Sequence, residues 1–131
     1  MTTAIHFTRQ AITVPPLDLP SREIGAVLEF QGLVREMEGE SLLTGLFYEA
    51  YEPMARTLME RHLAAVGEIH RVDTVLFIHR LGWVPVGQAS LYIRVLSSHR
   101  AEAMAFLAEA VIRLKQDVPI WKTKAGKPLP G

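Results

Sequence analysis

The order of apolar and polar positions predicts alternating strands and helices. Residues 25–35 place Ala26, Leu28, Phe30 and Val34 on one parity, as a strand with one buried face requires. A later strand is apolar on both parities, and we expect it at the centre of a sheet. That strand covers 72–80, and the other predicted strands cover 4–13, 42–50 and 88–97.

Two longer segments repeat apolar residues at helical spacing. Pro53 suits the first position of a helix over 53–69, because its missing N–H costs nothing there. A second helix covers about 99–118 and ends at Pro119, which disfavours helical geometry in the residue before it. We expect the first helix to bury Met54, Leu58, Ala65 and Ile69. We expect the second to bury Met104, Leu107, Val111, Leu114 and Val118.

The connecting segments complete the predicted fold. Residues 36–41 are acidic and contain glycine, which indicates a loop, and 82–87 indicate a turn. The order β-β-β-α-β-β-α predicts an α+β fold, in which a largely antiparallel sheet carries two amphipathic helices. We expect one domain over residues 1–131, with a short basic tail from about residue 119.

Length and composition narrow the class of protein. The chain has 131 residues, of which 49% are hydrophobic, as in ordinary globular domains. No apolar run approaches the roughly 18 residues that span a bilayer, and the first residues lack a signal-peptide pattern, so we expect a cytoplasmic protein. Cysteine is absent, which excludes disulfides, cysteine-ligated metals and a thiol nucleophile on this chain. Any sulfur chemistry must therefore use sulfur that another molecule carries.

The net charge is zero, but the charge is unevenly distributed. Residues 113–131 hold five cations against Asp117 alone, a net charge of +4, and all four lysines lie in the last 17 residues. A solvated basic tail explains this pattern. A site for an anionic ligand explains it too, although lysines without interleaved aromatic residues are a poor nucleic-acid footprint.

The start of the second predicted helix is a candidate anion site. Residues 97–100 read SSHR, and a helix N-terminus offers free N–H groups and partial positive charge. His99 and Arg100 would add charged donors, and either Ser97 or Ser98 can cap the helix. The same four residues also make an ordinary polar helix start.

Three cations elsewhere are candidates for chemistry. Lys115 lies beside the predicted apolar stripe of its helix, where it either extends along the apolar surface or has a desolvated amine. Lys122 follows Trp121, which suggests an anchored segment, although a solvated lysine beside a packed tryptophan fits as well. Arg35, at the end of a strand, can reach a ligand or pair with a neighbouring glutamate. No spacing of His, Asp or Glu indicates a metal site.

Taken in order, several segments resemble the large, catalytic subunit of molybdopterin synthase. The first opens like the family's Gly-Ala-x-x-x-Phe-x-Gly-x-Val-Arg, and a later one matches its His-Arg-x-Gly strand. The Ser-x-His-Arg helix start and a closing pair of lysines follow. The segments are 25–35 (GAVLEFQGLVR), 48–55 (YEAYEPMA), 78–87 (IHRLGWVPVG), 98–100 (SHR), 114–115 (LK) and 119–122 (PIWK).

The resemblance implies an α/β-hammerhead-like fold and sulfur transfer. That family converts cyclic pyranopterin monophosphate (precursor Z) to molybdopterin. Its sulfur comes from the C-terminal Gly-Gly thiocarboxylate of a small ubiquitin-like subunit. The large subunits form homodimers, and the whole assembly is a heterotetramer. No cofactor, metal, nucleic acid or membrane is implied.

The resemblance also implies roles for particular residues. Lys115 would be the principal catalytic residue, acting as a general acid/base near the thiocarboxylate carbonyl, and Lys122 the second active-site lysine. The implied substrate-binding positions are Leu33, Val34, Arg35, His99, Arg100, Lys115, Lys122, Thr123 and Lys124. The alternative is a non-catalytic, homo-oligomeric module that binds a phosphorylated ligand or a Gly-Gly tail without turnover.

Overall fold

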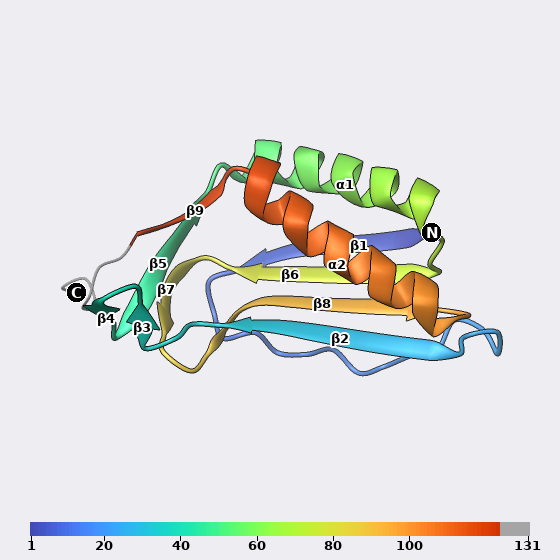
Figure 1. The fold of residues 1–131 in the computed structure, drawn as a ribbon, viewed down its shortest axis with the longest axis horizontal. Coiled ribbons are helices and arrows are strands. Elements are labelled where there is room, and N and C mark those ends of the chain that lie inside the picture. Colours follow the sequence, from blue (N-terminus) through green and yellow to red (C-terminus); the bar gives the residue numbers. More distant parts are fainter. Residues whose placement is uncertain (124–131) are drawn as a thin grey trace.

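A four-stranded sheet with two helices on one face organises the chain, of which the computed structural model describes residues 1–123 (Figure 1). The strand order is β1-β6-β8-β2; β1 runs parallel to β6, and the other neighbours are antiparallel. The bounds are Thr2–Thr8 for β1, Ala26–Leu33 for β2, Thr74–Arg80 for β6 and Ala89–Ser97 for β8. The fold is therefore α+β with mostly antiparallel pairing, and β6 is central, as predicted.

A smaller sheet stands at the end where β6 leads into β7 (Figure 1). Its order is β7-β5-β9, antiparallel throughout, and a two-residue hairpin of β3 and β4 lies beside it. The bounds are Met37–Glu38 for β3, Ser41–Leu42 for β4, Gly45–Ala50 for β5, Gly82–Pro85 for β7 and Ile120–Thr123 for β9.

This smaller sheet corrects the predicted order. The expected turn at 82–87 is a strand for its first four residues, and the expected loop at 36–41 folds into the β3–β4 hairpin around Gly39, whose φ is +62°. The expected basic tail begins as β9. Strands of two to four residues are too short to show an alternating pattern, so their partners, rather than their sequences, define them.

Both predicted helices exist, as α1 (Glu52–Ile69) and α2 (Arg100–Asp117). α1 buries a different face from the one expected. Of the residues expected to be buried by the second helix, Leu114 and Val118 are buried, Leu107 and Val111 are partly buried, and Met104 is exposed. Met54, Ile69 and Met104 are 49%, 62% and 57% exposed. Each helix carries apolar side chains on more than one flank, so hydropathy alone did not select the face. The small alanines that let a helix approach the sheet lie on the buried side. The buried residues are Ala55, Met59, Leu63 and Val66 in α1 and Ala103, Phe106, Ala110 and Leu114 in α2.

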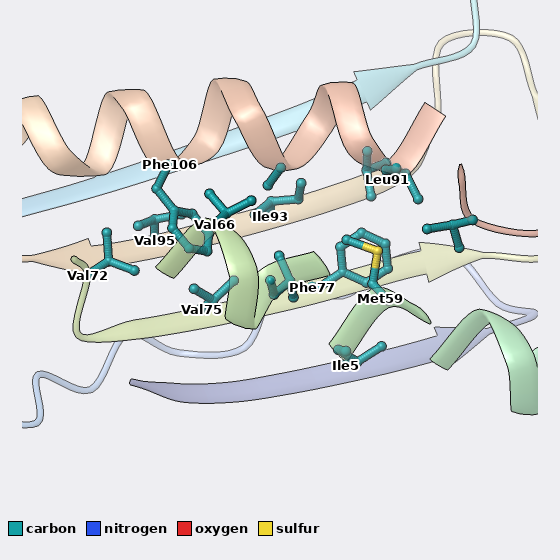
Figure 2. Close-up of a cluster of buried hydrophobic side chains, with 14 of the residues drawn as sticks. Ile5, Met59, Val66, Val72, Val75, Phe77, Leu91, Ile93, Val95 and Phe106 are labelled. Carbon is teal, nitrogen blue, oxygen red and sulfur yellow. The ribbon is translucent and has the colours of Figure 1, made fainter. Parts of the chain in front are cut away.

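The main core lies between the helices and the helix-facing side of the sheet (Figure 2). Met59 and Phe106 from the helices pack into one cluster with Phe77 of β6 and Ile93 of β8. A second, smaller cluster connects the end of β2 with the smaller sheet through Val34 and Val84. Neither helix within residues 1–123 combines the length and apolar character that a bilayer crossing requires.

Candidate active site

The start of α2 presents His99 and Arg100 to solvent. His99 is the N-cap residue, and its extended backbone lets the chain leave β8 and enter the helix. No side chain within residues 1–123 caps this helix, which corrects the prediction that Ser97 or Ser98 could cap it. Ser97 Oγ instead accepts a hydrogen bond from the backbone N–H of His99, at 3.5 Å. The first N–H groups of α2 therefore remain available to an anion.

A hollow of about 390 Å³ opens beside this helix start. Arg71 and Asp73 from the segment before β6 line it together with His99 and Glu102. Glu102 Oε2 is a buried atom with no hydrogen-bond partner within residues 1–123. The hollow thus combines an arginine and a histidine with two carboxylates and is not uniformly positive.

Lys115 lies in the last turn of α2, on its solvent side. Its amine has no ion-pair or hydrogen-bond partner among the described residues. A cation in the last helical turn is favoured by the helix dipole. Sequence analysis left open whether the amine of Lys115 is desolvated. In this chain alone the residue is exposed, so desolvation of the amine would require another molecule to cover it.

Lys122 lies on β9 opposite Tyr48 of β5, and so the anchored interpretation of this segment is correct. Its Nζ is 2.9 Å from Glu38 Oε1 in the β3–β4 hairpin. Trp121, its neighbour, donates from Nε1 to Glu49 Oε2 at 3.1 Å. Lys122 is therefore held and partly neutralised by a carboxylate that is 84 residues away in sequence.

The end of β2 alternates between exposed and buried side chains. Leu33 is 54% exposed, and Arg35 is exposed without an ion pair to any described residue. Val34 between them is buried in the second cluster, and its N–H donates to the carbonyl of Gln88. The side chains of Leu33 and Arg35 can therefore meet a ligand, whereas Val34 anchors the strand end.

One chain does not bring these candidates together. His99 and Lys115 stand at opposite ends of α2, which at 1.5 Å per residue separates them by roughly 24 Å. Arg35 follows the end of β2, at the edge of the sheet that leads toward the hairpin, whereas the start of β2 adjoins the start of α2 (Figure 1). The site is thus divided into a lysine end and a histidine end.

A buried histidine behind the lysine end was not among the predicted site residues. His79 of β6 is 5% exposed, and its ring donates through Nδ1 to the carbonyl of Arg80 at 2.8 Å. Its ring packs edge-on against Tyr48, the residue opposite Lys122, with centroids 5.2 Å apart. Burial lowers the pKa of His79 to about 4, so the ring is neutral near pH 7. The sequence signal was its place in a strand that is apolar on both parities.

Two further candidates complete the set. Thr123 is exposed at the end of β9, opposite Phe47, and Lys124 lies outside the described residues. Within residues 1–123 no cluster of three His, Asp or Glu side chains is arranged to hold a metal ion.

The sequence of the chain matches the model of a known family. The family model described as "MoaE protein" matches residues 6–117, which is most of the chain. The chain belongs to the MoaE protein family. The segments that carried the resemblance in sequence, apart from the closing 119–122, lie within this match.

Several curated relatives of this MoaE-family chain carry the name "Molybdopterin synthase catalytic subunit". The protein from Bacillus subtilis is 40% identical over 101 residues, covering 77% of this chain and 64% of the relative. The human protein is 36% identical over 121 residues, covering 90% and 64%. The chain therefore spans less than two-thirds of the length of these relatives. A Nostoc relative is 35% identical over 120 residues, covering 86% and 73%.

Solved structures of the family share the fold. Molybdopterin synthase from Staphylococcus aureus superposes with a TM-score of 0.78 at 28% identity, covering 88% of this chain and 86% of that chain. A Helicobacter pylori chain, solved as a complex of subunits 1 and 2 of molybdopterin-converting factor, has a TM-score of 0.69 at 24% identity and covers 90% and 82%. The latter likeness concerns the fold alone.

Proposed function

We propose that this chain acts in the cytoplasm as the catalytic subunit of a molybdopterin synthase. The chain would transfer sulfur to a cyclic pyranopterin monophosphate from the C-terminal thiocarboxylate of a small ubiquitin-like partner. Membership of the family and the shared name of the curated relatives support this reaction. The absence of cysteine fits it, because the sulfur arrives on the partner.

One observation carries the catalytic assignment: the amine of Lys115 has no partner among the described residues, whereas Lys122 is paired with Glu38. An extended Gly-Gly tail laid against the end of α2 would cover Lys115 and remove water from its amine. Desolvation favours the neutral amine, which can then exchange a proton with the reacting groups. Lys115 would act as a general acid/base near the thiocarboxylate carbonyl while the thiocarboxylate sulfur attacks the side chain of the pterin. Water would then hydrolyse the resulting thioester, which leaves the sulfur on the pterin and a carboxylate on the partner's tail. An arginine could not take this role, because it does not lose its proton.

The remaining cations would hold the anionic substrate. Arg35 can grip two phosphate oxygens, and His99 and Arg100 add donors beside the free N–H groups of α2. Lys122 would contribute once the phosphate either displaces the carboxylate of Glu38 from the Lys122 amine or binds that amine beside it.

We propose further that two copies of the chain build each site. The roughly 24 Å between the ends of α2 exceeds the reach of one small substrate, so the lysine end of one copy must meet the histidine end of another. With one small partner bound to each copy, the assembly would be a heterotetramer.

Lys115→Ala tests the reaction. We expect this variant to fold like the wild type and to form at least about 100-fold less molybdopterin from precursor and thiocarboxylated partner. Lys115→Arg should fail similarly, and Arg113→Ala, on the same helix, is the matched control. Near-wild-type turnover by Lys115→Ala would contradict the assignment. A wild-type chain that leaves the thiocarboxylate intact would instead be a binding module.

Mixing two inactive variants tests the shared site. If copies exchange freely, Lys115→Ala mixed with His99→Ala restores one intact site in each mixed dimer, or about a quarter of wild-type activity for a closed two-fold dimer. A mixture as inactive as its components would place both residues in sites within one chain.

A further inference from the structure

The β3–β4 hairpin brings one carboxylate to the lysine end of the site. Glu38 is the last residue of β3, and its Oε1 lies 2.9 Å from Nζ of Lys122 on β9. The side chain of Glu38 is 19% exposed, and that of Lys122 is 46% exposed. Glu36 and Glu40 are exposed and form no ion pair within residues 1–123. Of the three carboxylates in this segment, the hairpin therefore directs one to the lysine.

The hairpin that carries Glu38 is anchored at its base. The N–H of Leu43 donates to the carbonyl of Glu36 at 2.7 Å, and Leu43 is buried in the second hydrophobic cluster. The N–H of Val86 donates to the carbonyl of Thr44 at 3.0 Å, just before β5 begins. The fold therefore positions the carboxylate of Glu38 independently of the lysine that it meets.

The same segment carries Arg35 at its entrance. Arg35 lies three residues before Glu38, so their Cα atoms are at most about 11 Å apart. Arg35 directly follows the buried Val34, and it is exposed without an ion pair to any described residue. The Glu38 carboxylate therefore lies where an anion held by Arg35 would also reach the amine of Lys122.

The strand that carries Lys122 is held in place by other contacts. All four residues of β9 pair with β5, from Ile120 opposite Ala50 to Thr123 opposite Phe47. Trp121, whose side chain lies on the other face of the strand, donates from Nε1 to a carboxylate oxygen of β5 at 3.1 Å. The ion pair between Glu38 and Lys122 is therefore not needed to attach β9, and its effect falls on the amine itself.

This ion pair is easily exchanged. A pair with this much exposure contributes little to stability, because water also solvates both charges. A bound anion offers the amine of Lys122 the same kind of partner, so the amine can change partners at small cost. Until it does so, the carboxylate of Glu38 repels any other anion that approaches the amine.

We propose that Glu38 is a specificity-determining residue, which occupies the amine of Lys122 in the empty site and excludes small anions. Inorganic phosphate gains only the contacts of its own charge, whereas a pterin phosphate adds contacts through its rings and can offset the loss of the ion pair. Specificity of this kind arises from a penalty that the correct ligand overcomes and its competitors do not. The identity of the correct ligand rests on the proposed function, but the exchange at Lys122 does not.

Binding of inorganic phosphate tests the exchange without pterin or partner. Glu38→Gln keeps the size of the side chain and removes its charge. We expect it to lower the dissociation constant for phosphate, measured by isothermal titration calorimetry at low salt, by about three- to five-fold. Glu40→Gln removes a charge from the same hairpin and should change this constant by less than about 1.5-fold, because screened charges act weakly at a distance.

Three outcomes of this titration would overturn the proposal. They are an unchanged dissociation constant in Glu38→Gln, an equal change in Glu40→Gln, and no phosphate binding by either the wild type or Glu38→Gln. Circular dichroism and thermal melting check that the variants are folded.

A double substitution separates exchange at Lys122 from a general effect of charge or structure. In Lys122→Gln the amine is absent, so adding Glu38→Gln should tighten phosphate binding no more than adding Glu40→Gln does. A three- to five-fold tightening that persists without Lys122, in about the measure seen with it, would refute the exchange.

The reaction provides the last measurement. Phosphate should inhibit sulfur transfer by Glu38→Gln at about three- to five-fold lower concentration than it inhibits the wild type. Equal inhibition of the two proteins would refute the role in specificity. If the wild type transfers no sulfur, the proposed function fails, whereas the titration still decides whether the exchange occurs, so the two failures are distinct.

Discussion

The buried ring of His79 should make the stability of the protein depend on pH between about 4 and 6.5. The ring is neutral in the folded chain because burial lowers its pKa from 6.5 to about 4. In the unfolded chain the ring takes up a proton below pH 6.5, so the unfolded state binds more protons in this window. The free energy of unfolding therefore falls as the pH falls through this window. Above pH 7 the ring is neutral in both states, and its titration does not change the free energy of unfolding.

The size of the effect follows from the two pKa values of His79. At pH 4.5 the unfolded ring is almost fully protonated, and the folded ring only partly. The difference lowers the free energy of unfolding by about 2.5 kcal/mol relative to pH 7.5. His79→Phe keeps a ring of similar size but does not titrate. It also leaves the Arg80 carbonyl without its donor, which should cost about 1–3 kcal/mol at every pH.

Urea unfolding of both proteins at pH 7.5 and pH 4.5 measures this effect. Carboxylates and the other histidines titrate in both proteins, so subtracting the variant from the wild type isolates His79. We expect the wild type to lose about 2.5 kcal/mol more than His79→Phe between the two pH values. Equal losses in the two proteins would refute the argument that the ring is held neutral by burial.

Three further substitutions test contacts that the structure makes specific. A Cβ added at Gly45 would lie 2.5 Å from the carbonyl oxygen of Val84, so Gly45→Ala should lower the free energy of unfolding by more than about 2 kcal/mol, whereas Gly32→Ala, which has room, should change it by less than about 1 kcal/mol. Urea unfolding of each variant measures these changes. A Gly45→Ala protein as stable as the wild type would contradict the prediction. Arg94 donates to the carbonyl of Pro15 at 2.6 Å and so anchors the connector between β1 and β2. Arg94→Met should therefore lower the free energy of unfolding by about 2 kcal/mol and speed proteolysis of this connector. An unchanged cleavage rate would contradict this anchoring.

The parts of the fold that could be predicted are those with long periodic signals. The alternation along 25–35 predicted β2, and helical spacing predicted both helices. What the pattern did not determine was which face of α1 is buried. Met54 is more hydrophobic than its neighbour Ala55, yet Ala55 faces the sheet, because close packing there favours a small side chain. Such choices depend on the shape of the opposing surface, which a single sequence does not contain.

The sequence suggests candidate site residues one by one but not their arrangement in space. Helix-end chemistry suggested His99, and the position beside the apolar stripe suggested Lys115, yet the same helix holds the two apart. The pairing of Lys122 with Glu38 joins β9 to a hairpin far away in sequence, and neither segment indicates the other. Long-range pairings of this kind arise from the topology of the smaller sheet. β5 was predicted within 42–50, but its partners β7 and β9 were missed because each has only four residues.

The pairing of β9 with β5 also sets an order of assembly. Ala50 lies opposite Ile120, about 70 residues later in the chain, so the central strand of the smaller sheet is synthesised long before its second neighbour. Until then β5 can pair on one side only, and its other edge is exposed to any extended segment nearby. A chain cut short after α2 would keep the larger sheet and both helices. It would nevertheless be prone to aggregate at β5, and it would lack β9 together with Lys122.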